Sequence, residues 1–242
     1  MGSYIYRTNY YETDYWSLIP TGHLLRLAMH AITLKTDAEG LAPERIRGEL
    51  GALWMLARAR FYQYAPIRSE RDLELRVSGR SIDRGTYARA IDFFDAGEKL
   101  ARCELASVAV NISERRILRP RVVEDFWEHS EPPENNVCVP RLKLRAELPK
   151  IKDYTVSPRD CDYNRHFNSS NYIDFVSELA GFYEGGPKIL EYLQIDYNSE
   201  ALPGQRLSLE GELNGATGSI KGVHEGGSVC FAAEYKMRGV DI

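Results

Sequence analysis

The most informative stretch of this 242-residue chain is residues 158–168, which read PRDCDYNRHFN and stand directly before an apolar helical pattern. Asp162, Asn164, His166 and Asn168 alternate along it, so an extended or turning backbone directs their side chains toward one side. A neutral imidazole beside a carboxylate takes a proton from water near pH 7. The stretch therefore predicts a hydrolytic or general-base site.

Composition limits the class of protein to which the chain belongs. With 43% hydrophobic and 27% charged residues, it can bury a core and predicts one large or two small globular domains. Lys and Arg total 31 against 35 Asp and Glu, and this net charge of −4 argues against a general nucleic-acid binder. The four cysteines are scattered without a CxxC pair, which favours a reducing compartment over a disulfide framework or a zinc site.

The same reading gives expectations about location and cofactors. The first residues lack a basic stretch followed by an apolar one, and no run of about 18 apolar residues exists, so we expect a soluble, cytoplasmic protein without a membrane span. The histidines have no neighbours at metal-ligand spacing, and no Gly-rich loop follows a strand. We therefore expect neither a metal nor another cofactor.

The order of predicted elements repeats. Each half runs from a strand through one long apolar helix into several antiparallel strands, with the helices after Pro20 and after Asn168. This order predicts an α+β fold of two units, in which a curled antiparallel sheet wraps a long helix. We place the units at residues 1–120 and 148–242. The linker, 121–147, lies in a region rich in proline and charge and includes a short helix at Val122 to Trp127, with Trp127 packed against one unit.

These residues resemble a known family. A helix inside a curled antiparallel sheet is the hot-dog unit, and the spacing of Asp162, Asn164, His166 and Asn168 is similar to the signature of plant and bacterial acyl-acyl carrier protein (acyl-ACP) thioesterases. Those enzymes hold two hot-dog units in one chain. Further stretches resemble the family as well: residues 54–58, 89–95, 115–120 and 195–200. The last of these is a predicted strand that ends at Glu200, before the Pro203-Gly204 turn.

The resemblance implies the catalytic set Asp162, Asn164, His166 and Glu200. Its implied activity is hydrolysis of fatty acyl-ACP thioesters by an activated water, within fatty acid biosynthesis. In this scheme His166 and Glu200 act as the base, Asn164 binds the thioester carbonyl or the water, and Asp162 orients its neighbours. The backbone N–H groups near the helix start add a positive dipole toward the oxyanion. Some family members carry a cysteine after the glutamate, but this chain has Ala201, which excludes a covalent cysteine there.

The sequence of the first unit predicts no catalytic site. Gly22 and His23 stand where its helix begins, without amide or carboxylate partners, and Tyr64 is the rough counterpart of Glu200. We expect this unit to shape the acyl pocket. The basic residues around Arg115, with Arg141, Lys143 and Arg145 further on, are candidates for contact with an acidic carrier protein, although a solvated linker explains them equally well.

Three other interpretations of the chain stay open. In a hot-dog acyl-CoA thioesterase Asp162 itself serves as base or nucleophile, and a non-catalytic acyl-binding protein keeps only the pocket. The polar cluster also matches ordinary turn and cap chemistry, in which Asp, Asn and Ser bond local N–H groups and Ser169 or Ser170 caps the helix. A homodimer is compatible with the sequence.

Overall fold

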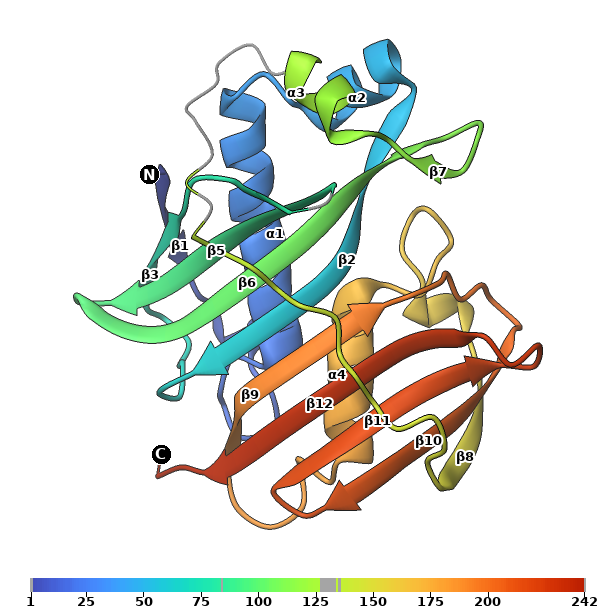
Figure 1. Cartoon of the computed structure of the whole chain (residues 1–242). Helices are drawn as coiled ribbons and strands as arrows, with labels where there is room; N and C mark the ends of the chain where they lie inside the picture. The colour runs from blue at the N-terminus through green and yellow to red at the C-terminus, as the bar shows by residue number, and fades with distance from the viewer. Residues whose placement is uncertain (1, 84, 127–133, 135, 242) are drawn as a thin grey trace.

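The computed structural model describes residues 2–83, 85–126, 134 and 136–241. In this part of the chain all the strands belong to one twelve-stranded antiparallel sheet, and two long helices, α1 and α4, lie on one face of it (Figure 1). The first half contains β1 (Gly2–Arg7), the one-turn helix η1 (Tyr10–Glu12), α1 (Thr21–Ala38), α2 (Pro43–Leu50), β2 (Ala52–Gln63), β3 (Asp72–Val77), β4 (Ser81–Asp83), β5 (Thr86–Asp95), β6 (Glu98–Asn111), β7 (Arg116–Ile117) and α3 (Pro120–Phe126).

The second half repeats the main elements of the first. It contains β8 (Lys150–Thr155), the one-turn helix η2 (Pro158–Asp160), α4 (Ser169–Leu179), β9 (Lys188–Tyr197), β10 (Arg206–Asn214), β11 (Thr217–His224) and β12 (Val229–Gly239). The strand order is β1-β3-β5-β6-β2 in one half and β8-β10-β11-β12-β9 in the other, so the two halves have the same topology. Strands β2 and β9 pair antiparallel at the centre and join the halves into one sheet (Figure 1).

Each long helix is held by apolar side chains at helical spacing. In α1 these include Leu24, Leu25 and Ala28, and in α4 Ile173 and Val176, all fully buried. One continuous hydrophobic cluster contains residues of both helices and of both halves of the sheet. The predicted α+β fold with a long helix wrapped by a curled sheet in each half is therefore confirmed.

A tyrosine locks the segment after the first strand of each half. Tyr6 on β1 donates to the carboxylate of Glu12, and Tyr154 on β8 donates to that of Asp160. The same carboxylates accept the backbone N–H groups of Asn9 and Ser157, three residues earlier, as in a capping box. This matching detail shows that the repeat extends to individual side chains.

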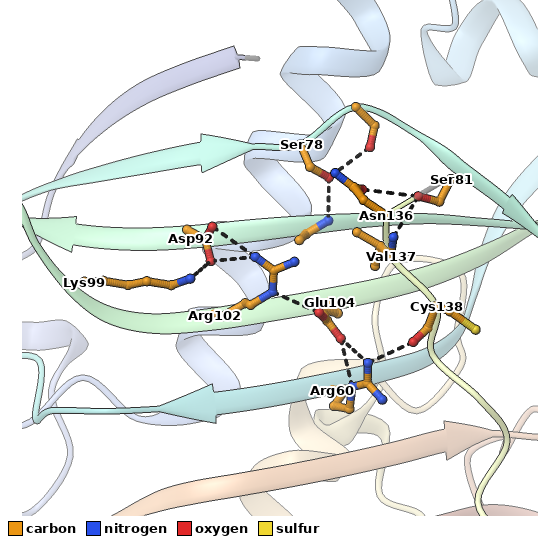
Figure 2. A network of polar contacts seen from close by, with 12 residues as sticks. Arg60, Ser78, Ser81, Asp92, Lys99, Arg102, Glu104, Asn136, Val137 and Cys138 are labelled. Atoms are coloured by element: carbon orange, nitrogen blue, oxygen red, sulfur yellow. Dashed lines mark hydrogen bonds and ion pairs between the residues drawn. The ribbon is translucent and has the colours of Figure 1, made fainter. Parts of the chain in front are cut away.

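Residues 136–149, which we call the strap, connect the halves across the sheet face opposite the helices (Figure 1). Buried polar side chains of the sheet bind the strap's backbone (Figure 2): Arg60 donates to the carbonyl of Cys138, and Ser81 accepts the N–H of Val137. Over the second half, Gln194 donates to the carbonyl of Pro140 and Asp196 accepts the N–H of Leu142. The linker is thus part of the folded structure, since an extended strap satisfies groups that are costly to bury alone.

Several sequence predictions need correction. Residues 4–13, rich in tyrosine and β-branched residues, predict a first strand, but β1 ends at Arg7, where the chain turns into η1. Asn168, and not Ser169 or Ser170, caps α4, because its side-chain oxygen accepts the N–H of Ser170. The linker helix begins earlier than predicted, at Pro120, and Trp127 lies outside the described residues. The boundaries 1–120, 121–147 and 148–242 stay a prediction.

Within the described residues, we find no helix with the length and apolar character needed to cross a membrane.

Candidate active site

The polar stretch forms a tight loop directly before α4. Cys161 and Phe167 face each other as an isolated antiparallel bridge, and between them the N–H of Asp162 donates to the carbonyl of His166 at 2.8 Å. Arg165 adopts a left-handed backbone with φ of 63°, which reverses the chain. Of the two backbones that the sequence allowed, extended or turning, the stretch therefore adopts the turning one.

Backbone contacts bring this loop to the end of β9. The N–H of Phe167 donates to the carbonyl of Ala201 at 2.9 Å, and the hydroxyl of Tyr197 donates to the carbonyl of Ser169 at 2.8 Å. As a result His166 Nε2 lies 3.4 Å from Glu200 Oε2, with both side chains about one-third exposed. The structure thus brings together two residues that are 34 positions apart in sequence.

The other two predicted residues are placed differently. Asp162 Oδ1 accepts the backbone N–H groups of Asn164 at 2.8 Å and His166 at 3.3 Å, so this carboxylate builds the loop that presents His166. The Asn164 side chain is exposed on the loop. Asp160 and Asn168 have the structural roles that the sequence indicated: Asp160 belongs to the tyrosine lock and Asn168 caps α4.

The start of α4 offers less to an oxyanion than we expected. The N–H of Ser170 is bound by the Asn168 side chain, and that of Asn171 donates to the carbonyl of Asn168. The N–H groups of Ser170 and Asn171 are therefore engaged in capping the helix. The helix contributes the positive end of its dipole, which favours negative charge nearby.

A shallow hollow of about 680 Å³ opens beside Glu200. Polar groups line much of it, from the loop after β9 and from the turn between β11 and β12: Ser199, Gln205, Arg206, His224 and Ser228. Ser199 Oγ and His224 Nε2 are 2.9 Å apart on its wall. The carboxylate of the His166–Glu200 pair is thus accessible to a polar ligand from solvent.

One residue of the first half also reaches the pair. Arg115 Nη2 lies 3.2 Å from Glu200 Oε2 and 3.4 Å from Oε1. The sequence analysis placed Arg115 only in a basic group for a carrier protein. Its contact with Glu200 was missed because residues 85 positions apart leave no local signal in the sequence; the contact becomes visible once β2 pairs with β9.

The turn itself is duplicated in the first half. Asp14 Oδ1 accepts the N–H groups of Trp16 at 2.8 Å and Leu18 at 3.1 Å, as Asp162 accepts those of Asn164 and His166. Ser17 takes the left-handed backbone of Arg165, with φ of 61°. Leu18 therefore occupies the place of His166, and the first half has no imidazole there.

The counterpart of Glu200 follows from the same comparison. The N–H of Ile19 donates to the carbonyl of Ile67, as that of Phe167 does to Ala201, so Pro66 stands where the second half has Glu200. The predicted counterparts, Gly22-His23 and Tyr64, were wrong because the equivalent turn lies before the helix and is recognised only by its hydrogen bonds.

The geometry supports neither a cysteine nucleophile nor a metal site among the described residues. Cys161 donates to the carbonyl of Ser157, and burial with the nearby Asp160 and Asp162 raises the pKa of its thiol, which disfavours the nucleophilic thiolate. Ala201 is buried after Glu200. Among the residues that the structure describes, no three His, Cys, Asp or Glu side chains gather closely enough to hold a metal ion.

Comparisons with known proteins agree with this architecture. Residues 144–236 match the family described as acyl-ACP thioesterase C-terminal domain. The fold is similar to that of an acyl-ACP thioesterase from Bacteroides thetaiotaomicron, with a TM-score of 0.80 and 16% identity over 98% of this chain and 97% of that one. It is also similar to the 12:0-ACP thioesterase from Umbellularia californica, with a TM-score of 0.78 and 16% identity over 98% and 96% of the two chains.

A proposed oleoyl thioesterase from Lactobacillus plantarum has a TM-score of 0.78 and 22% identity, with 99% of this chain and 96% of that chain covered. A search of curated protein sequences found no match. The fold is thus that of a tandem hot-dog protein. Residues 144–236 match the acyl-ACP thioesterase C-terminal domain family, as the resemblance seen in the sequence predicted.

Proposed function

We propose that the protein hydrolyses fatty acyl-ACP thioesters to free fatty acid and carrier protein. The observation that carries this proposal is the contact between His166 Nε2 and Glu200 Oε2 at 3.4 Å, in a unit of the matching family. An imidazole held by a carboxylate is a general base suited to neutral pH, and the adjoining hollow gives a substrate access to it.

The reaction follows from these positions. His166 removes a proton from water, and the water oxygen attacks the thioester carbonyl carbon while Glu200 stabilises the imidazolium. The exposed amide of Asn164 stands on the same loop and donates to the carbonyl oxygen as it becomes negative. When the C–S bond breaks, the imidazolium returns the proton to the departing thiolate. Asp162 holds the loop through the backbone of Asn164 and His166.

We assign the carrier contact to the first unit's edge beside the site. Arg116, Arg119 and Arg121 are exposed and follow Arg115 in sequence, and Arg121 pairs with the exposed Asp125 at 3.7 Å. An acidic carrier is attracted by such a group even though the whole chain is negative. The strap residues Arg141 and Lys143 are exposed too, but they lie on the sheet face opposite the helices.

The remaining expectations accompany this function. The unit at 1–120 shapes the acyl pocket, the unit at 148–242 carries the reacting groups, and the protein works in the cytoplasm in fatty acid biosynthesis. The duplicated turn supports the division of labour, since Leu18 and Pro66 replace His166 and Glu200 in the first unit.

The decisive experiment offers the same acyl groups on carrier protein and on CoA and measures thiol release across chain lengths. We expect kcat/KM to be higher on the carrier protein. His166→Ala and Glu200→Ala should each lower kcat by about a hundredfold or more, the range of a lost general base. Cleavage of the CoA substrates alone indicates an acyl-CoA thioesterase. Ligand binding without turnover on either carrier indicates an acyl-binding protein.

A further inference from the structure

The carboxylate of Glu200 lies between two cationic partners from different halves of the chain. Arg115 contacts both of its oxygens, and His166 Nε2 lies 3.4 Å from Oε2. The Glu200 side chain is 30% exposed and that of Arg115 is 76% exposed. Because a free glutamate at the end of a strand samples several rotamers, two contacts on its oxygens restrict it to the one that faces the imidazole.

The turn that carries Arg115 is built to hold it in place. Asn111 closes this turn: its carbonyl accepts the N–H of Arg115 at 2.9 Å, and its side chain accepts the N–H of Glu114 at 2.8 Å. Strand β7 then pairs with β6 through Val110 and Asn111. Arg115 itself has φ of 53°, a left-handed conformation that costs an arginine more than a glycine. The chain therefore presents a long charged side chain at a position where its backbone is disfavoured.

In Figure 1 the β7 hairpin of the first half projects over the loop that leads into α4. The ion pair between Arg115 and Glu200 joins this hairpin to the site. The Asp162 carboxylate lies under the His166 backbone, and His224, Arg206 and Glu225 line the hollow on the other side of Glu200.

We propose that Arg115 is a positioning residue for the hydrolysis, supplied by the first unit, which keeps the Glu200 carboxylate oriented toward His166. This inference rests on the proposed function. A guanidinium is always charged and binds a carboxylate through a planar fork, so it fixes the anion without taking part in proton transfer. The first unit, which has Leu18 and Pro66 in place of His166 and Glu200, then completes the site of the second.

The test compares Arg115→Ala with Arg47→Ala, which removes an exposed arginine of α2, also in the first unit. We expect Arg115→Ala to lower kcat by up to about fivefold on acyl-ACP and acyl-CoA alike, the scale of one partly exposed ion pair, while KM for both substrates changes little. Arg115→Lys should recover part of the loss, and Arg47→Ala should leave kcat unchanged.

Two results overturn the proposal. One is an Arg115→Ala variant whose kcat equals that of Arg47→Ala. The other is a rise in KM for acyl-ACP alone, with kcat and the CoA reaction unchanged, which makes Arg115 a docking residue. The NMR chemical shifts of the His166 ring, recorded in both variants, test the contact without turnover. Shifts that change only in Arg115→Ala support it even if no acyl thioester is hydrolysed, and equal shifts in the two variants contradict it.

Discussion

Asp14 and Asp162 make the same set of hydrogen bonds in two turns of equal length, each three residues before a long helix. In both turns the aspartate carboxylate accepts two backbone N–H groups, and the backbone N–H of the aspartate donates to the carbonyl of the residue four positions later. Only the second turn carries an imidazole. The shared bonds therefore belong to the scaffold of the turn, because they are present also where the turn has Leu18 in place of the imidazole.

This relationship predicts the effect of changing Asp162. Asp162→Asn keeps an oxygen for the two N–H groups, so we expect kcat to stay within about fivefold of the wild type, whereas Asp162→Ala leaves both N–H groups without that partner and lowers kcat and thermal stability together. Steady-state kinetics and thermal unfolding provide the measurement.

Matched changes at Asp14 serve as the control for the previous prediction. Asp14→Asn and Asp14→Ala should reproduce the stability effects with little change in the reaction. A loss of more than a hundredfold in Asp162→Asn, with its melting temperature intact, would show instead that the Asp162 carboxylate itself takes part in proton transfer.

Removal of the cap of α4 should weaken the second unit. Asn168→Ala takes away the acceptor for the Ser170 N–H and hydroxyl, at a cost of about 1 kcal/mol in the free energy of unfolding. Asn168→Asp retains that acceptor and should lose much less, and urea unfolding measures both. Equal losses in the two variants contradict a capping role.

The attachment of the strap to the sheet should depend on Asp196. This buried carboxylate accepts the N–H of Leu142 at 2.9 Å and the amide of Gln194 at 3.2 Å. Asp196→Ala leaves both donors without it, so we expect a loss of about 1–3 kcal/mol in unfolding free energy and faster hydrogen exchange at residues 140–146. Exchange measured by mass spectrometry should stay unchanged in α1, and uniform acceleration throughout the chain would argue against a local role.

Asp174 should make stability depend on pH in a defined direction. Burial raises its pKa to about 6, while Arg26 at 3.7 Å acts in the opposite direction. The folded state thus binds this proton more tightly than the unfolded state, whose carboxyl has a pKa near 4. The contribution favours folding below pH 4 and is lost as the pH rises through 6.

Asp174→Asn should therefore raise the unfolding free energy at pH 7 relative to the wild type, and the gain should shrink toward pH 4. The side chain is 42% exposed, so solvent screening reduces the expected gain to about 1 kcal/mol. Asp153 is a control of opposite sign, because Lys150 and Arg206 lower its pKa and its contribution is lost as the pH falls. Urea titrations between pH 4 and 8 measure both, and a constant difference for Asp174→Asn contradicts the prediction.

The sequence predicted much of the fold because its signals are local. The apolar spacing of Leu24, Leu25 and Ala28 marks one helix, and Ile173 and Val176 mark the other, since the period of a buried helix is written in neighbouring residues. Residues 43–50 predict a short helix and residues 53–64 a strand, and the structure has α2 at Pro43–Leu50 and β2 at Ala52–Gln63. The repeat and the polar stretch before α4 were also visible in the sequence.

Other features were decided by contacts between distant residues. The equivalence of Leu18 with His166 and of Pro66 with Glu200 is a pattern of backbone hydrogen bonds, which different side chains satisfy equally well. The pairing of β2 with β9 places the two halves side by side, and only then does Arg115 reach Glu200 across 85 positions. Periodicity and motif thus determined the units and the candidate residues, whereas tertiary packing decided which of those residues meet, because a contact depends on the path of the whole chain.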